Sequence, residues 1–543
     1  MPTIYIDHQP YIVREGINLL QALLELGFNL PYFCWHPAMG SVGACRQCAI
    51  KQFRDENDTR GRIVMACMTP ANDNTYISVF DPEALQFRAS VTEWMMINHP
   101  HDCPVCDEGG ECHLQDMTIM TGHNYRRHRG KKRTFNNQEL GPFINQEMNR
   151  CIQCYRCVRF YRDYAGGRDF NAFSLHDTVF FGRAFPGVLE SEFSGNLVEV
   201  CPTGVFTDKQ YKQKYARKWD LATTPSICVN CSVGCNTIPG ERMGELRRIR
   251  NRYNGDVNGY FLCDRGRYGW EFVNGPRRIH SAGAAGGEPL TKEKTIERIQ
   301  QAFSGSPRLM GIGSPRASLE SNYALHVLVG PENFYQGIPN REQGLVAQII
   351  DILQNGPARS PSLHDISTCD AVLLLGEDVS NTAPMMAFAL RQAVRQQPVK
   401  RVSKELNIPP WDEYPIRQVI QDERGPLYII TPNATRIDDI ATGVYHGAPE
   451  DIARLGFAVA HELDASAPEV PDLPDAVLSL AAAIAAALRG AERPLVLSGT
   501  SLGSPEVIQA AASVAWALCS MGRPAQLGYA FAECNTLGLG LIG

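Results

Sequence analysis

The sequence predicts an α+β region followed by an α/β region. Fifteen of the 18 cysteines lie before residue 264, in stretches where short strands, helices and loops follow one another irregularly. After that point apolar strand-like runs alternate with helical ones, which is typical of a parallel sheet with covering helices. A chain of 543 residues is too long for one hydrophobic core, so several domains are expected.

Composition excludes several classes of protein. A hydrophobic content of 44% and a charged content of 20% are those of an ordinary globular protein, and a net charge of −6 argues against nucleic-acid binding. The N-terminus has no signal-peptide pattern, and the longest apolar run, 478–488, is too short to cross a bilayer. We therefore expect a reducing compartment, in which clustered cysteines are metal ligands rather than disulfides.

The cysteines fall into four sets whose size and spacing suit iron–sulfur clusters. The sets are Cys34, Cys45, Cys48 and Cys67; Cys103, Cys106 and Cys112; Cys151, Cys154, Cys157 and Cys201; and Cys228, Cys231, Cys235 and Cys263. Thiolate is a preferred soft ligand of iron, and four ligands per cluster are usual. The second set therefore needs one further donor. Four clusters on one chain indicate an electron relay.

The first set follows a predicted hairpin, 3–6 and 11–13, and an amphipathic helix, 18–26, that stops at Gly27. Its spacing resembles the plant-type [2Fe–2S] ferredoxin, a β-grasp fold, although the first gap is ten residues instead of four. The alternative is a zinc site on Cys45 and Cys48. We predict a [2Fe–2S] β-grasp domain over residues 1–81.

The second set follows a helix with clear boundary signals. Asp81 is the predicted N-cap, Pro82 occupies the first helical position, and Pro100 stops the helix near residue 98. Imidazole is the donor expected to complete the three thiolates. The residues alone leave His99, His101 and His113 as candidates. The predicted [4Fe–4S] domain covers residues 82–122.

The third set begins with the Cys-x2-Cys-x2-Cys triplet of bacterial ferredoxins, at Cys151, Cys154 and Cys157. The fourth cysteine of that pattern is absent, because position 161 is Tyr, and Cys201 takes its place. One [4Fe–4S] cluster is therefore expected within a ferredoxin-like domain over residues 140–217. The triplet suits a zinc ribbon poorly, since a ribbon needs two separate cysteine pairs.

The fourth set ends with a gap of 27 residues before Cys263. This spacing resembles the front of molybdopterin enzymes such as formate dehydrogenases. It predicts a further [4Fe–4S] domain over residues 221–277, with short strands between 240 and 249.

The order of the four motifs resembles the family of large iron–sulfur subunits of NADH–quinone oxidoreductase, respiratory complex I. The stretches that carry the resemblance are 31–37 (PYFCWHP), 99–106 (HPHDCPVC) and 192–204 (EFSGNLVEVCPTG), and it runs from residue 1 to residue 543. The resemblance implies that His99 is the fourth ligand of the second set. It also implies one [2Fe–2S] cluster, three [4Fe–4S] clusters and no molybdopterin.

The same resemblance implies a function. Single electrons from a flavin subunit would pass through the clusters towards quinone, within a proton-translocating NADH:quinone oxidoreductase. The implied partners are the flavin subunit with its small iron–sulfur partner and the quinone-side subunits of the peripheral arm. The implied location is peripheral, on the cytoplasmic face of the bacterial inner membrane, with only indirect membrane contact.

Residues 278–543 are predicted to form an α/β domain like that of molybdopterin oxidoreductases. Strands are expected at 309–312, 371–375, 427–430 and 494–497. The glycines at 311–313 and 499–503 are candidate phosphate loops, but tight strand-to-helix turns are the favoured interpretation. Cys369, Cys519 and Cys534 are isolated in sequence and expected to be buried small groups.

The main alternative function is a molybdopterin-dependent formate dehydrogenase-type catalytic subunit. Such an enzyme would carry lysine two residues after Cys263, where this chain has Arg265. Cys369 remains a candidate molybdenum ligand of such an enzyme. An iron-only hydrogenase would share the first three motifs, but the expected active-site cysteine motifs do not follow residue 263.

Two further segments stand out. The basic run 126–133 (RRHRGKKR) is interpreted as a docking surface for an acidic patch, as a counter-charge to nearby clusters, or as a solvated face. The apolar, glycine-rich end at 537–543, together with the greater length of similar subunits, leads us to expect a C-terminally truncated subunit whose α/β domain is incomplete.

Overall fold

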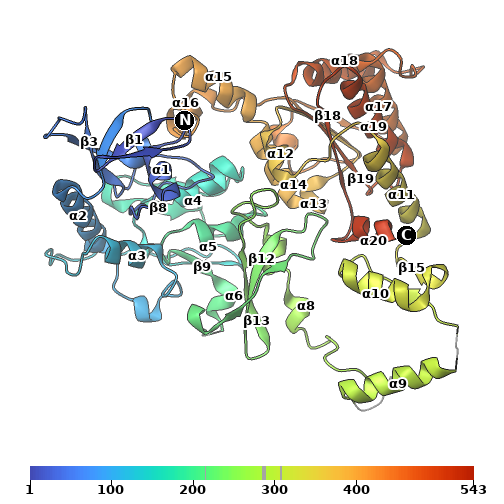
Figure 1. Ribbon diagram of the computed structural model, residues 1–543, viewed down its shortest axis with the longest axis horizontal. Helices are drawn as coiled ribbons and strands as arrows, with labels where there is room; N and C mark the ends of the chain where they lie inside the picture. The colour runs from blue at the N-terminus through green and yellow to red at the C-terminus, as the bar shows by residue number, and fades with distance from the viewer. Residues whose placement is uncertain (215, 284–288, 306–307, 543) are drawn as a thin grey trace. The chain divides into compact units, whose positions relative to one another are not determined.

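The computed structural model describes residues 1–214, 216–283, 289–305 and 308–542 (Figure 1). It divides into two compact units. The first contains residues 1–222, 260–264 and 395–424, and the second contains residues 223–259, 265–394 and 425–543. The chain therefore passes between the units several times instead of completing one before starting the next.

The first unit begins with a β-grasp sheet of order β2-β1-β5-β3-β4. Its strands are β1 (Thr3–Ile6), β2 (Gln9–Ile12), β3 (Ala49–Phe53), β4 (Arg62–Met65) and β5 (Thr75–Ser78). Helix α1 (Leu19–Glu25) buries its leucines against this sheet (Figure 1, blue). The predicted hairpin and helix are confirmed, with the second hairpin strand starting two residues earlier than expected.

Helix α2 (Pro82–Asn98) has the predicted boundaries. The Asp81 carboxylate accepts hydrogen bonds from the backbone N–H groups of Glu83 and Ala84, as an N-cap does. The turn η2 (Cys103–Val105) and helix α3 (His113–Met120) follow. The second cysteine set therefore lies between the carboxyl end of α2 and the start of α3.

The remainder of the first unit consists of short elements around an aromatic core. These are β6 (Ile144–Gln146) paired with β9 (Phe206–Asp208), β7 (Asn171–Phe173) paired with β8 (Phe180–Gly182), α4 (Arg156–Val158), the π-helical turn η4 (Arg159–Tyr164), α5 (Leu197–Val200), α6 (Lys209–Lys212), α15 (Gln396–Leu406) and α16 (Glu413–Ile420). Phe160, Tyr161 and Phe170 are among its fully buried side chains. This aromatic core carries the loops of the third cysteine set.

The second unit contains a small antiparallel sheet and a larger parallel one. Strands β11 (Ser226–Ile227), β12 (Asn236–Arg242) and β13 (Glu245–Asn251) belong to the former. The parallel sheet has the order β18-β17-β16-β19-β20, with β16 (Ala371–Leu375), β17 (Leu427–Thr431), β18 (Gly443–His446), β19 (Pro494–Gly499) and β20 (Gln526–Ala530). The strands predicted at 371–375, 427–430 and 494–497 are confirmed.

Helices cover both faces of the parallel sheet (Figure 1). On one face lie α11 (Asn340–Asn355), α17 (Pro449–Leu463), α18 (Asp475–Gly490) and α19 (Pro505–Ser520); on the other lie α12 (Leu363–Thr368), α13 (Val379–Thr382) and α14 (Pro384–Ala393). Leu373 and Leu375 belong to the first core, whereas Val372 and Leu374 belong to the second. This alternation, with both faces buried, confirms the predicted α/β fold.

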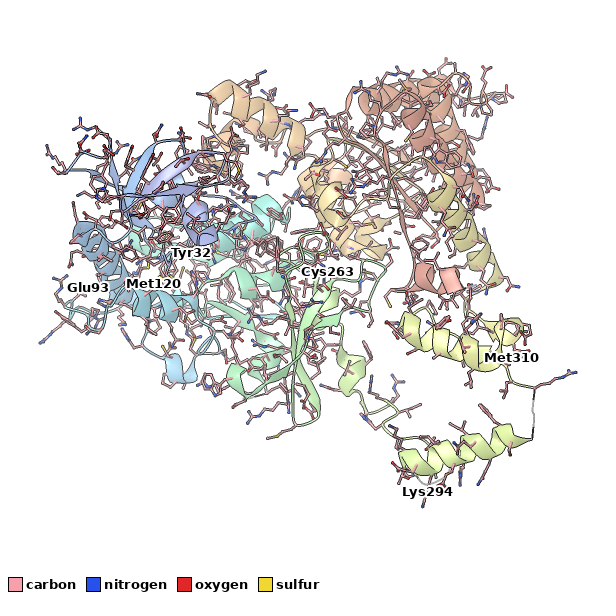
Figure 2. The ribbon with its side chains drawn as sticks, viewed as in Figure 1. Tyr32, Glu93, Met120, Cys263, Lys294 and Met310 are labelled. Atoms are coloured by element: carbon pink, nitrogen blue, oxygen red, sulfur yellow. The ribbon has the colours of Figure 1, made fainter. Side chains whose placement is uncertain are left out.

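The expected strand at 309–312 is shorter than predicted. Strand β14 (Gly311–Ile312) forms a two-residue parallel pair with β15 (Phe334–Tyr335), next to α10 (Leu319–Val329) and α20 (Thr536–Ile542). Helix α9 (Lys292–Ser304) has no buried side chain (Figure 2, near Lys294). Among the described residues, no helix combines the length and the apolar character needed to span a bilayer.

The tight packing at Gly499, the last residue of β19, leads to a testable prediction. A Cβ atom at Gly499 would overlap the Glu377 carboxylate. We expect Gly499→Ala to destabilise the protein by about 1–3 kcal/mol, the usual effect of overpacking. Gly344→Ala is the control, because a Cβ there meets nothing within 4 Å and lies inside α11, where alanine is favoured. Thermal unfolding should show a lower midpoint for the first variant only; equal midpoints would contradict the prediction.

Candidate iron–sulfur sites

The structure brings the four thiols of the first set together. All four are buried, and the Cys34 thiol is hydrogen-bonded to those of Cys45 and Cys67, while Cys67 also bonds to Cys48. These contacts lower the pKa of Cys34 and raise the pKa of Cys67. Four sulfur atoms therefore face one small space at the edge of the β-grasp sheet.

Backbone amides donate to these sulfur atoms. The N–H of Cys34 lies 3.5 Å from the Cys45 sulfur, and the N–H of Cys67 lies 3.5 Å from the Cys48 sulfur. Such donation stabilises thiolate and tunes the potential of a bound cluster. Gly43 adopts a φ of 66°, which lets the loop turn tightly between the first two cysteines.

Buried arginines surround this loop. Arg88 donates to the carbonyls of Ala49 and Val79 at 3.0 and 2.8 Å, and Arg159 donates to the Cys34 carbonyl at 2.7 Å. Sequence reasoning missed both residues. The one available signal was that Arg159 closely follows the Cys154–Cys157 pair.

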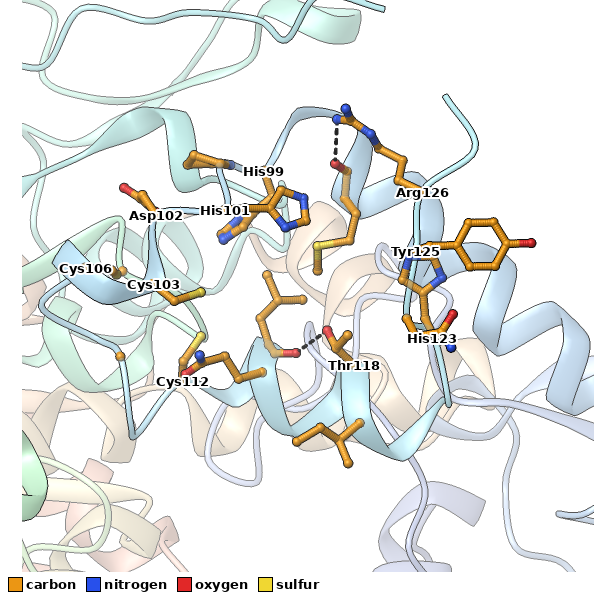
Figure 3. Close-up of a pocket in the computed structure, with 18 residues that line it drawn as sticks. His99, His101, Asp102, Cys103, Cys106, Cys112, Thr118, His123, Tyr125 and Arg126 are labelled. Atoms are coloured by element: carbon orange, nitrogen blue, oxygen red, sulfur yellow. Dashed lines mark hydrogen bonds between the residues drawn. The ribbon is translucent and has the colours of Figure 1, made fainter. Parts of the chain in front are cut away.

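The second set lines a cavity of about 330 Å³. Figure 3 shows the His99 and His101 rings facing this space together with the sulfur atoms of Cys103 and Cys112. Cys106 also lines it. Its volume falls within the range of roughly 300–1,000 Å³ that is common for small ligands.

Two of the three candidate histidines, His99 and His113, differ in what holds their rings. His99 Nδ1 lies 3.1 Å from the Arg150 carbonyl. Because a carbonyl only accepts, Nδ1 carries the proton, and the lone pair of the neutral ring is on Nε2. Burial lowers the pKa of His99 to about 4, so the ring is neutral at pH 7. His113 instead donates from Nε2 to the Tyr32 carbonyl at 2.7 Å, and it does not line the cavity.

The basic segment 126–133 folds against α2. Arg126 donates to the Ile97 carbonyl at 3.0 Å, Lys132 donates to the His99 carbonyl, and Arg127 forms a bidentate pair with Glu93. Cations at the carboxyl end of a helix are favoured by its dipole. The solvated-face interpretation is therefore wrong for Arg126 and Lys132, whereas Arg127 keeps a side chain that is 68% exposed while it pairs with Glu93. A docking role for the segment stays a prediction.

The four thiols of the third set also lie close together. Burial raises the pKa of Cys157, and charge repulsion from Cys154, Cys151 and Cys201 raises it further. The Gln153 N–H donates to the Cys151 sulfur at 3.3 Å. Buried, mutually repelling thiols with amide donors fit a cationic iron–sulfur core. In the described part of the chain, no three His, Cys, Asp or Glu side chains form a site for a single metal ion.

One apolar core connects the first three sets. It contains Cys34 and Cys45 of the first set, Cys112 of the second and Cys154 of the third, together with Phe33, Met96, Leu114 and Met117. A second link is the Arg150 backbone, because the residue that orients His99 immediately precedes Cys151. The three sites are therefore neighbours within the first unit.

The fourth set is divided between the two units. Cys228, Cys231 and Cys235 lie in the loop between β11 and β12, whereas Cys263 belongs to the 260–264 segment of the first unit. The Cys228 N–H donates to the Cys235 carbonyl at 2.8 Å, which closes the loop. The four-ligand set itself stays a prediction.

The isolated cysteines differ from one another. Cys369 is fully buried, and its thiol donates to the Asp365 carbonyl at 3.2 Å. It precedes the amino end of β16, while ligand sites of α/β sheets lie at the carboxyl ends, so its position argues against a molybdenum ligand. The expectation of burial is confirmed for Cys369 but is wrong for Cys519 and Cys534, which are only partly buried. Partial burial still raises the pKa of the Cys534 thiol, and the charge of Cys231 adds to the effect.

The candidate phosphate loops are tight turns, as favoured above. The buried Glu377 carboxylate accepts hydrogen bonds from the Ser501 hydroxyl at 2.6 Å and the Ser501 N–H at 3.3 Å, so the chain's own anion occupies the donors of the 499–503 loop. Burial raises the pKa of Glu377. In the other loop the Gly313 N–H donates to the Tyr335 carbonyl at 2.7 Å.

Four family models match the chain in the order of the four cysteine sets. They describe a 2Fe-2S iron-sulfur cluster binding domain (residues 1–79), an NADH-ubiquinone oxidoreductase-G iron-sulfur binding region (88–127), the ferredoxin-like domain of NADH-quinone oxidoreductase subunit 3 (141–207) and a molybdopterin oxidoreductase Fe4S4 domain (221–275). The fold and these matches define an iron–sulfur protein with several cluster-binding domains.

Curated relatives narrow this class. This chain aligns over 100% of its length with the G subunits of NADH-quinone oxidoreductase from three bacteria. It is 55% identical to that of Pseudomonas fluorescens, 54% to that of Pseudomonas putida and 53% to that of Escherichia coli K12. The chain is thus homologous, along its full length, to the G subunit of NADH-quinone oxidoreductase, and the resemblance noted in the sequence is confirmed. It spans 60% of the length of these relatives.

A solved structure of an NAD+-reducing [NiFe]-hydrogenase in the H2-reduced state also aligns with this chain. The alignment covers 38% of this chain and 87% of that one, at 24% identity and a TM-score of 0.35. A likeness this low carries no argument about function.

The close approach of Gly204, near the third site, to Cys106 of the second site leads to a testable prediction. A Cβ atom at Gly204 would lie 2.6 Å from the Cys106 sulfur, so Gly204→Ala should displace that thiol and lower the iron content by up to about four atoms per chain. Gly187→Ala is the control, because its nearest contact is an ordinary 3.4 Å to Arg183 Nε. Unchanged iron in the Gly204 variant would contradict the predicted crowding.

Proposed function

We propose that this chain carries single electrons within an NADH:quinone oxidoreductase, from the flavin subunit through iron–sulfur clusters towards quinone. The observation that carries the proposal is the apolar core shared by Cys34, Cys112 and Cys154, which makes three cysteine sets neighbours. Full-length homology to the G subunit of that complex supports the choice of complex.

The proposed ligand sets are those of the sequence motifs. Cys34, Cys45, Cys48 and Cys67 hold a [2Fe–2S] cluster, and [4Fe–4S] clusters are held by His99, Cys103, Cys106 and Cys112; by Cys151, Cys154, Cys157 and Cys201; and by Cys228, Cys231, Cys235 and Cys263. The anchored Nδ1–H of His99 supports its choice over His113. No molybdopterin is part of the proposal.

The clusters, when bound, supply one-electron redox chemistry. The chain's own groups hold and tune them: amides donate to Cys45 and Cys48, and burial excludes water. A neutral His99 in place of a thiolate leaves one negative charge fewer at the second site. We assign the path to the first, third and second sites in that order, with the fourth off the path.

The proposed partners are the flavin subunit with its small iron–sulfur partner, and quinone-side subunits of the peripheral arm. The proposed location is the cytoplasmic face of a bacterial inner membrane, held there through the complex. A formate dehydrogenase-type role is not favoured, because Arg265 stands where lysine is required and donates to the Asn381 carbonyl at 2.6 Å.

The role of His99 is testable by substitution. His99→Cys should retain a cluster but lower its reduction potential, because a thiolate adds negative charge. His99→Ala should lose the cluster or its spectral identity, whereas His113→Gln should retain the wild-type signal, since His113 donates to Tyr32 instead. Redox titration followed by electron paramagnetic resonance (EPR) measures both properties. A wild-type potential in His99→Cys would remove His99 from the ligand set.

Metal analysis tests the function itself. Protein purified without oxygen should contain about fourteen iron atoms per chain, and the dithionite-reduced protein should show one [2Fe–2S] and three [4Fe–4S] signals at low temperature. Zinc instead of iron would indicate a structural scaffold. Molybdenum or tungsten would restore the formate dehydrogenase alternative.

A further inference from the structure

Two arginines of the third cysteine segment hold the loop of the first. Arg159 donates to the Cys34 carbonyl at 2.7 Å and to the Gly40 carbonyl at 3.0 Å, and also reaches the Met39 carbonyl. Arg156 donates to the Trp35 carbonyl at 2.5 Å. Both arginines flank Cys157, so one helical turn contributes a ligand of the third site and two clamps on the first.

The two arginines differ in their compensation by carboxylates, which Arg156 lacks among the residues that the structure describes and Arg159 has in part. Both residues are 7% exposed. Arg156 forms no ion pair within the described residues, and its buried Nε has no hydrogen-bond partner there. The Arg159 guanidinium lies 4.0 Å from Glu413, which Arg395 also approaches, at 3.9 Å.

Burying a guanidinium is costly unless a counter-charge is near, and carbonyl dipoles satisfy its hydrogen bonds without neutralising it. Cysteine thiolates would supply further counter-charge: the Arg159 charge interacts with Cys34 of the first set, and the Arg156 charge interacts with Cys154 of the third. A [2Fe–2S] cluster with four thiolate ligands carries net negative charge, and taking up one electron from a donor adds one more.

We propose that Arg156 and Arg159 raise the reduction potential of the first cluster site by placing buried positive charge on its loop, from the segment that holds the third cluster. This rests on the proposed function. The shared turn also couples the two sites, because movement of Cys157 moves the clamp on residues 34–40.

The test is a set of charge variants in the full chain. Arg159→Gln removes the charge, Arg159→Lys keeps it but loses the forked contacts, and Arg162→Gln removes a charge from the same turn where the side chain is 47% exposed and paired with Asp163. The readout is the midpoint potential of the [2Fe–2S] EPR signal during anaerobic titration with dithionite, with iron content measured on the same samples.

We expect Arg159→Gln to keep the cluster and lower its reduced-to-oxidised ratio about tenfold at a given potential, a downward shift of about 59 mV for one electron. Arg159→Lys should remain near the wild-type potential, and Arg162→Gln should not move it. If Arg159→Gln fails to fold, Arg156→Gln, which loses the Trp35 hydrogen bond and the contact with the Tyr32 ring, should show the same direction of shift.

Three results would overturn the inference. The first is a wild-type potential in Arg159→Gln and Arg156→Gln, and the second is a shift in Arg162→Gln equal to that in Arg159→Gln. The third is an equal shift in Arg159→Gln and Arg159→Lys, which would make the arginine a clamp without an electrostatic role. A wild-type protein with no [2Fe–2S] signal would instead overturn the proposed function. The two failures are therefore distinguishable.

Discussion

Gathering cysteine thiolates in a low-dielectric interior is the constraint on which the first unit depends. Burial raises the pKa of Cys112 and of Cys154 to about 12, and repulsion between neighbouring thiolates adds to the effect for Cys154. Metal binding requires the deprotonated thiolate, so a cation must compensate for the free-energy cost of burying several negative charges together. Bound iron would stabilise the thiolate form. The amide donors at Cys45 and Cys151 and the buried arginines stabilise the same form.

The sites are also mechanically connected. The Arg150 carbonyl orients His99, while its guanidinium pairs with Asp102 at 2.7 Å. Gly204, three residues after Cys201, leaves room for Cys106, and Arg159 clamps the Cys34 loop. The first and second sites therefore each depend on residues of the third motif, so one substitution there is expected to affect two sites.

Local patterns predicted much of this molecule. Capping by Asp81 and Pro82 located α2, cysteine spacing identified the sets, and continuous apolar runs located three strands of the parallel sheet. The contacts that choose and tune the ligands could not be predicted in this way. His99 is hydrogen-bonded to the Arg150 carbonyl, 51 residues away in the sequence, and Arg159 to the Cys34 carbonyl, 125 residues away. Contacts at such separations leave no periodic or spacing signal in the sequence.

The central claim is that the first and third sites are near enough to exchange electrons through the core they share. Spin-relaxation measurement by pulsed EPR tests it most directly. The reduced [2Fe–2S] signal should relax faster once the third site is also reduced, because a nearby second spin opens a relaxation path. A relaxation rate that does not depend on the state of the third site would contradict the relay.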